Sequence, residues 1–127
     1  MPTITILYAG LLGLISIALA VIIGRVRGRT GVSIGDGGNA EVIVAMRRQA
    51  NFVEIVPLAL ILIGLLELNG VGNGAVHGLG AGLFIARICH AIGYGTNDSL
   101  TTLRIIGAAG STLITLIASI WAISVFF

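Results

Sequence analysis

Two long apolar runs without a charged residue, residues 3–23 and 105–127, constrain the fold of this chain more than any other feature. Each is long enough to cross the ~30 Å hydrocarbon core of a bilayer, which takes about 20 helical residues. Two further runs, residues 52–68 and 75–93, are apolar but carry polar interruptions. Since 57% of the 127 residues are apolar and only 9% are charged, a soluble domain of this size has no interior large enough to bury them. The sequence therefore predicts an all-α integral membrane protein, in which four transmembrane helices form one domain over residues 1–127.

Polar and glycine-rich segments set the expected ends of these helices. The first helix is expected to end near Ile23, because a loop rich in glycine and arginine follows it. Asn39 is a suitable N-cap for the second helix, which would continue to a tight loop at residues 69–74. The third helix would end near Gly93, and the fourth would occupy the remainder of the chain.

All seven basic residues are arginines, and they gather beside two of the three predicted loops. Five flank the first loop and two flank the third: Arg25, Arg27, Arg29, Arg47 and Arg48, then Arg87 and Arg104. The positive-inside rule therefore predicts that loops 1 and 3 lie in the cytoplasm and both termini lie outside. The arginines follow the first apolar run rather than precede it, which favours a retained anchor over a cleaved signal peptide. The sequence has no separate basic domain, so we expect no nucleic-acid partner.

Few residues are available to bind a metal ion. Cys89 is the only cysteine, which excludes an intramolecular disulfide and a cysteine-based metal site. The two histidines, His77 and His90, are thirteen positions apart at opposite ends of one predicted helix. We therefore expect no metal.

Polar residues at helical spacing interrupt the second and third apolar runs. They form two stripes: Arg47, Asn51 and Glu54 (i, i+4, i+7) on the second helix, and Arg87, His90 and Tyr94 (i, i+3, i+7) on the third. Each stripe lies on one face of its helix, so its members are expected to point into the bundle or into a wet cavity.

These stripes are expected to share one depth with the start of the fourth helix. If Glu67 marks the outer edge of the membrane, a rise of ~1.5 Å per residue places Asn51 and Glu54 inside the hydrocarbon core. Residues that lie equally far before and after a tight loop are expected at the same depth in the membrane. Counted in this way about loops 2 and 3, the pairs at equal depth are Glu54 with Cys89, Tyr94 with Gln49, and Arg104 with Ala91. The sequence thus predicts a polar layer, shared by three helices, near the cytoplasmic face.

The charges of this layer do not balance. An ionised group at membrane depth is costly unless it is paired, so we expect Glu54 and Arg87 to form an ion pair. A structural ion pair needs only one arginine, whereas Arg47, Arg87 and Arg104 all surround a single carboxylate. This excess of positive charge predicts an anionic ligand that enters from the cytoplasm at the lipid boundary. Arg48 is expected to contact lipid headgroups.

The segment "RRQANFVEIVP" has the form R-x-x-x-N-x-x-E-x-x-P. It resembles the signature of the MAPEG family, the membrane-associated proteins in eicosanoid and glutathione metabolism. "GDGGN" before the second helix and "ARICHAIGY" on the third look like the bacterial members, and the similarity extends over nearly the whole chain. The resemblance implies a homotrimer in a bacterial inner membrane, with glutathione bound between neighbouring protomers near the cytosolic side.

The resemblance also implies roles for individual residues. Glutathione would contact the two stripes already described, at Arg47, Asn51, Glu54, Arg87 and Tyr94. Gln49 would reach the ligand in a neighbouring protomer. Arg104 would stabilise the glutathione thiolate, since a guanidinium favours the charged form of a thiol. One arginine near loop 1, either Arg25 or Arg27, contributes in some relatives.

Three departures from the family pattern bear on catalysis. Ile55 follows the motif glutamate where a tyrosine is common, and His90 stands where eicosanoid-type members have tyrosine. Loop 3 is also longer before Arg104. The first two departures remove hydroxyl donors to the ligand. His90 is still expected to contact the substrate, either as a general base or as a hydrogen-bonding group.

The residues and the resemblance together predict a glutathione transferase or a peroxidase-like enzyme, whose thiolate attacks an apolar electrophile or lipid that arrives through the membrane. One alternative is a non-enzymatic protein of the same fold that binds lipid or glutathione. A second alternative is a small proton-coupled transporter that uses Glu54. A small four-helix drug exporter would carry an acid in the first helix, and residues 3–23 contain none.

Overall fold

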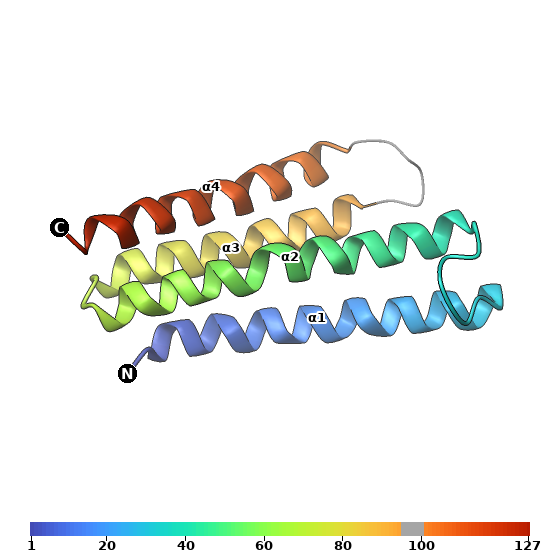
Figure 1. Ribbon diagram of the computed structural model, residues 1–127, viewed down its shortest axis with the longest axis horizontal. Helices are drawn as coiled ribbons and strands as arrows, with labels where there is room; N and C mark the ends of the chain where they lie inside the picture. The colour runs from blue at the N-terminus through green and yellow to red at the C-terminus, as the bar shows by residue number, and fades with distance from the viewer. Residues whose placement is uncertain (95–100) are drawn as a thin grey trace.

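Four antiparallel α-helices make up the described part of the chain, residues 1–94 and 101–127 of a computed structural model (Figure 1). They are α1 (Thr3–Thr30), α2 (Ala40–Leu68), α3 (Asn73–Gly93) and α4 (Thr102–Ser124). Each is long and apolar enough to cross a membrane, and no strand occurs in the described residues. The predicted all-α membrane bundle of four helices is therefore confirmed.

The first helix is longer than predicted. α1 continues past the expected end at Ile23 to Thr30, where Gly31 adopts a φ of 73° and donates its N–H to the carbonyl of Arg27. At ~1.5 Å per residue its 28 residues measure about 42 Å, so its last turns extend beyond a ~30 Å hydrocarbon core. Arg25 and Arg29 therefore lie on a helix rather than in a loop, as suits a residue with high helix propensity.

Side-chain caps fix the starts of α2 and α4. The Asn39 side chain accepts hydrogen bonds from the backbone N–H groups of Glu41 at 2.9 Å and Val42 at 3.3 Å, so the predicted cap is confirmed. Thr101 caps α4 in the same way and accepts from the backbone N–H of Arg104 at 3.3 Å. Arg104 consequently lies in the first turn of α4.

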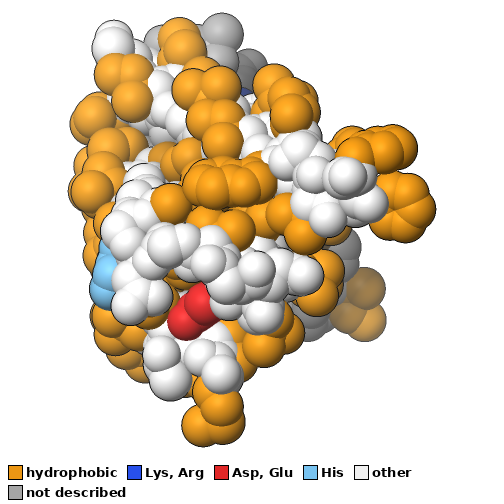
Figure 2. All heavy atoms as spheres, turned by 90° about the vertical axis from the view of Figure 1, so that its left-hand side faces the viewer, with side chains coloured by type: hydrophobic (Ala, Val, Ile, Leu, Met, Phe, Trp, Pro, Cys, Tyr) orange, Lys and Arg blue, Asp and Glu red, His pale blue; other side chains and the backbone are white. Residues whose placement is uncertain are grey.

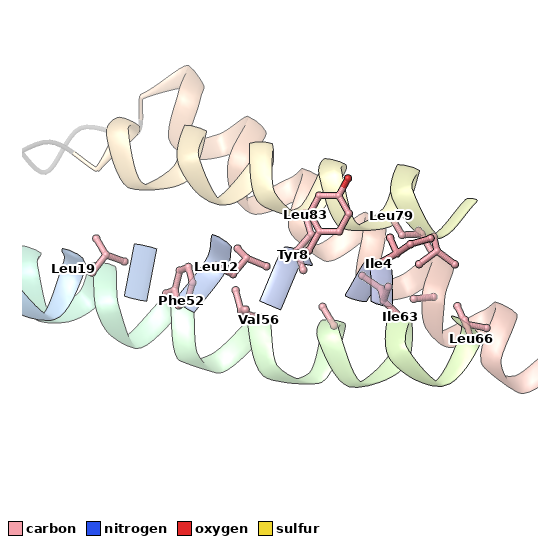
Figure 3. Packing of buried hydrophobic residues seen from close by; sticks show 13 residues of the cluster. Ile4, Tyr8, Leu12, Leu19, Phe52, Val56, Ile63, Leu66, Leu79 and Leu83 are labelled. Carbon is pink, nitrogen blue, oxygen red and sulfur yellow. The ribbon is translucent and has the colours of Figure 1, made fainter. Parts of the chain in front are cut away.

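The interior of the bundle is built from apolar side chains of all four helices, with Ala118 as the fully buried member from α4. Figure 3 shows Leu12 of α1, Phe52, Val56 and Ile63 of α2, and Leu83 of α3 within one buried cluster. α2 contacts all three other helices, whereas no Cα atoms of α1 and α4 lie within 8 Å of each other among the described residues. α1 and α4 therefore flank the bundle on opposite sides.

Two glycines let neighbouring helices approach closely. A Cβ atom at Gly80 would lie 2.2 Å from the ring of Tyr8, which is buried against α3 at this point. A Cβ atom at Gly107 would lie 2.4 Å from the backbone nitrogen of His90. The second contact brings the backbone of α4 against that of α3, next to the polar layer.

A carboxylate from α2 caps the start of α1. Pro2, the N-cap residue, offers no side-chain cap. Instead, Glu67 accepts hydrogen bonds from the backbone N–H groups of Ile4 at 2.9 Å and Thr5 at 2.8 Å, and from the Thr5 hydroxyl at 2.6 Å. A negative charge is favourable at this position, because the first N–H groups of a helix lack partners within it. This contact ties α1 to α2 at the end of the bundle that carries both termini.

Large apolar side chains cover the outside of the bundle. Figure 2 looks at the end that carries both termini and the α2–α3 turn, and hydrophobic side chains form most of its rim. Exposed isoleucines and leucines come from all four helices. A largely apolar exterior of this kind is suited to lipid rather than to water.

Candidate functional site

A pocket opens between α2, α3 and α4 at the end of the bundle opposite both termini. Its volume is about 400 Å³. Its polar lining consists of Arg47 and Asn51 from α2, His90 and Tyr94 from the end of α3, and Arg104 from α4. Ile105, Ala108 and Ala109 of α4 supply the apolar side. All five polar lining residues belong to the predicted ligand site, and the structure brings them together.

Arg87 lies behind this pocket with only neutral partners. Its side chain is 1% exposed, and it donates to Asn51 Oδ1 at 2.9 Å, His90 Nδ1 at 3.1 Å and Ser111 Oγ at 3.4 Å. The guanidinium carbon also lies 5.5 Å from the ring centroid of Phe52. No carboxylate of the described residues pairs with Arg87. A full positive charge is therefore held beneath the floor of the pocket.

The contact with Arg87 fixes the proton of His90. An arginine has donors and no acceptor, so Nδ1 of His90 must accept the hydrogen bond from Arg87. The proton of the neutral imidazole is then on Nε2, the nitrogen that forms no hydrogen bond with the described residues. His90 lines the pocket as an N–H donor, which does not suit the predicted general base and agrees with the alternative of a hydrogen-bonding group.

Tyr94 connects two arginines on opposite sides of α3. Nη2 of Arg104 donates to the Tyr94 hydroxyl at 3.2 Å, and the Arg104 guanidinium carbon lies 4.0 Å from the centroid of the Tyr94 ring. Arg48 donates to the backbone carbonyl of Tyr94 from the other side. The ring is thus held in place and carries a cation on its face.

The depth of the polar layer was predicted closely. Arg48 contacts Tyr94, one residue from the expected pairing of Tyr94 with Gln49. A Cβ atom at Gly93 would lie 2.3 Å from the backbone nitrogen of Arg104, two residues from the expected pairing of Arg104 with Ala91. Three helices therefore contribute polar groups at one level, as the residue count indicated.

The predicted ion pair between Glu54 and Arg87 is wrong. Glu54 is exposed and lines a second cavity of about 390 Å³ between α2 and α4, together with Ile55, Leu58, Thr112, Thr115, Leu116 and Ser119. Arg87 instead points into the bundle toward Asn51. The count along the helices carried no information on the direction of each side chain. Arg29 and Glu41 form the one salt bridge among the described residues.

Gln49 lies outside the pocket. Its Nε2 donates to Ser16 Oγ at 3.3 Å, which turns it toward α1 rather than toward α3. Its Oε1 is buried and has no hydrogen-bond partner among the described residues. Gln49 is thus placed on a different face of α2 from Arg47 and Asn51.

The arginines near loop 1 are also outside the pocket lining. Arg27 bends onto its own loop and donates to the carbonyl of Val32 at 3.2 Å and to Met46 Sδ at 3.3 Å. Arg25 is exposed at the end of α1.

Sequence reasoning missed Ser111. Its hydroxyl is fully buried, donates to the Gly107 carbonyl at 2.7 Å and accepts from Arg87. Ser111 lies seven residues after Arg104, on the same stripe of α4. This spacing was a usable signal, because a serine on a polar stripe of a membrane helix is expected to have a partner.

Comparisons with known proteins cover most of the chain. The model of the MAPEG family matches residues 5–124. The chain is also 34% identical over 91 residues to "Inner membrane protein YecN" of Escherichia coli, and the match covers 72% of this chain and 70% of that protein. The same named protein in a second Escherichia coli strain gives the same identity and coverage. No solved structure matches the chain significantly.

Proposed function

This chain belongs to the MAPEG family, and from that premise we propose that it is a membrane-bound glutathione transferase or peroxidase-like enzyme, with glutathione bound in the pocket between α2, α3 and α4. The thiolate of glutathione attacks an apolar electrophile that enters from the membrane. The proposal places the protein in a bacterial inner membrane, in keeping with the name of its relative. Loops 1 and 3 lie in the cytoplasm, on the side where the arginines gather.

The observation that carries this proposal is the unbalanced positive charge of the pocket. Arg47 and Arg104 line it, Arg87 lies buried behind it, and no described carboxylate pairs with any of the three. Glutathione carries two carboxylates, which arginine binds through paired N–H donors. A volume of about 400 Å³ also falls in the range of small-molecule sites.

The exposed Glu54 supports the same ligand. It lies three residues beyond Asn51 on α2, or about 4.5 Å further along the helix axis, and lines the second groove, between α2 and α4. The ammonium group of glutathione would contact this carboxylate while its own carboxylates bind the arginines. Beyond Glu54 the groove is lined mainly by apolar groups such as Ile55, Leu58 and Leu116, which suits an apolar second substrate.

Three donors are available to the sulfur. They are the guanidinium of Arg104, the Tyr94 hydroxyl and the Nε2–H group of His90, all of which line the pocket. A guanidinium and neutral donors favour the thiolate over the thiol, because each interacts more strongly with the charged form. With a chlorinated aromatic, the sulfur would form a bond to the ring carbon while chloride leaves, and the thiol proton would pass to water.

The assembly that we propose is the homotrimer of the family. Arg47 and Glu54 are both exposed on the α2–α4 side of a single chain, and Glu54 would face hydrocarbon there. A neighbouring copy would cover them. In the proposed trimer, Gln49, which lies on the α1 side of α2, would contact the ligand of a different copy.

Isothermal titration of the detergent-solubilised protein with glutathione tests the binding step. We expect saturable binding that weakens about 10- to 100-fold in Arg47→Gln, since hydrogen bonds to charged groups are worth ~1.5–3 kcal/mol. Arg29→Gln is the matched control, because Arg29 pairs with Glu41 outside the pocket. Absence of binding, or equal binding by both variants, would refute the site.

A second candidate function is a binding protein without catalysis. Ile55 and His90 favour it, because each stands where a hydroxyl donor is common in the family. Formation of the glutathione conjugate of a chlorinated nitroaromatic separates the two. Turnover that depends on Arg104 establishes the enzyme, whereas binding of glutathione without turnover establishes the binding protein.

A further inference from the structure

A second groove lies on the side of the bundle that faces away from α4. Its volume is about 420 Å³. α1 lines it with Ile15, Ala18, Leu19 and Ile22, and α3 lines it with Ile88, Ala91 and Ile92. The single polar side chain of this lining is Arg48, which reaches the groove from α2. The apolar groove therefore ends at the guanidinium of Arg48.

Arg48 has an N–H donor that no described residue accepts from. It donates to the backbone carbonyl of Tyr94, and its Nε is buried with no hydrogen-bond partner among the described residues. No described carboxylate pairs with it. Arg25 lies three residues after Ile22, on the same stripe of α1, and is exposed. Two uncompensated positive charges thus stand at the arginine-rich end of an apolar groove.

We propose that this groove binds an anionic glycerophospholipid, with one acyl chain between α1 and α3 and the phosphate on Arg48 and Arg25. From Ile15 to Ile22 the groove spans about 10.5 Å of helix. This is most of the ~15 Å that one leaflet contributes to the hydrocarbon core. The guanidinium groups then lie at the depth of the headgroup, where arginine binds a phosphate strongly.

Charge favours a lipid over a second copy of the chain as the occupant. In a cyclic assembly every copy presents its arginine-rich end at the same level of the membrane. A neighbour seated in this groove would therefore bring more arginines toward Arg48 and Arg25. An anionic phosphate neutralises these two residues instead. A zwitterionic headgroup neutralises them less well, because it carries a positive charge of its own.

Native mass spectrometry of the intact, detergent-solubilised protein tests the site. The probes are phosphatidylglycerol and phosphatidylcholine with identical acyl chains. We expect at least tenfold tighter retention of phosphatidylglycerol, and we expect Arg48→Gln to abolish most of this preference while Arg48→Lys keeps part of it. Arg29→Gln is the matched control, because Arg29 is an exposed arginine that pairs with Glu41 and does not line the groove. The control should retain the preference.

A second variant tests the acyl chain separately from the charge. Ala18→Trp fills the groove and leaves both arginines in place, so it should release phosphatidylglycerol while the melting temperature stays within a few degrees of the parent. Equal retention of the two lipids by the parent, or an unchanged preference in Arg48→Gln, would overturn the proposal. So would equally tight binding of soluble glycerol phosphate, or a change of subunit number in Ala18→Trp, which would identify the groove as a protein interface.

Discussion

At the scale of single residues, the candidate site is organised around Arg87, which the pocket itself does not expose. Its guanidinium reaches Asn51 on α2, His90 on α3 and Ser111 on α4, so one side chain links three helices. All three partners are neutral. The charge of Arg87 therefore remains available to attract an anion, while its hydrogen bonds fix the groups that would contact that anion.

Arg104 provides the first prediction. Arg104→Ala should abolish the ultraviolet absorbance of the glutathione thiolate that appears on binding, because the variant lacks the guanidinium that lies in the pocket beside Tyr94. Arg104→Lys keeps a positive charge and should retain part of the absorbance. An unchanged thiolate signal in Arg104→Ala would assign the stabilisation to another group.

His90 provides the second prediction. His90→Phe removes the Nε2–H donor and should lower kcat/KM for conjugation about 10- to 100-fold, the effect of losing a hydrogen bond to a charged group. His90→Gln retains an N–H donor and should recover part of the loss. If His90 acts instead as the base, the glutamine variant will be as inactive as the phenylalanine variant, and the pH profile of kcat/KM will lose its acidic limb.

The sequence predicted the depth of these residues better than their direction. Asn51 and Glu54 are three positions apart, which turns them about 60° from each other around α2, since each residue advances ~100°. That rotation is enough to point Asn51 at Arg87 and to leave Glu54 exposed. The direction of each side chain depends on how α2 is rotated about its axis relative to α3. Counting residues along the chain does not give this rotation.

At the scale of helices, the close contact between α3 and α4 positions the pocket. A Cβ atom at Gly107 would lie 2.4 Å from the His90 nitrogen and 2.5 Å from the Ala86 carbonyl oxygen. Gly107→Ala should therefore force α4 away from α3 and destabilise the fold by about 1–3 kcal/mol. Thermal unfolding in detergent, followed by circular dichroism, measures the loss.

Gly78→Ala is the control for this variant. Gly78 is also a helical glycine, but a Cβ atom there meets nothing within 4 Å. Alanine in place of glycine within a helix favours the folded state by ~0.5–1 kcal/mol, so this variant should be at least as stable as the parent. Equal stability of Gly107→Ala and Gly78→Ala would show that the two helices have room to separate.

The cap on α1 gives a further prediction for the helices. Glu67→Ala removes the acceptor for the backbone N–H groups of Ile4 and Thr5, so hydrogen exchange of these amides should accelerate. The melting temperature should also fall. Glu41→Ala, which removes an exposed partner of Arg29, should leave both amides protected.

Helix ends were predictable where a side chain marks them. Asn39 identified the start of α2, because its side chain accepts the first free N–H groups. The end of α1 was placed too early, since the prediction followed the end of the apolar run rather than the chemistry of the cap. Gly31, the glycine that ends the helix, was present in the sequence as a signal.

At the scale of the whole molecule, the side formed by α2 and α4 exposes Arg47 and Glu54 in a single chain. The proposed homotrimer predicts a detergent-corrected mass of three 13.0 kDa protomers by light scattering. Glu54→Leu should reduce the trimer fraction and weaken glutathione binding, because the variant lacks the carboxylate that would contact the neighbouring copy and the ligand. In a monomer, the same change would only replace a charge that faces lipid and would raise stability.

The fold and the membership of the family could be predicted from composition and from one motif. Four apolar runs define the number of helices, and the arginine–asparagine–glutamate spacing identifies the family that the comparison confirms. The groove between α1 and α3 could not be predicted from composition or from a motif. It depends on Arg48 passing between two helices to reach Tyr94, and the sequence alone suggested only a contact with headgroups.

The burial of Arg87 has a consequence for biosynthesis. An arginine within a transmembrane helix makes insertion of that helix by the translocon less favourable, and Arg87 lies in the second half of α3. The most apolar stretch of α3 also has the lowest mean hydropathy among the four helices. The partners that satisfy Arg87 come from α2, made earlier, and from α4, made later. α3 therefore lacks a complete set of partners when it leaves the ribosome, and its integration depends on the hairpin with α2 until α4 emerges.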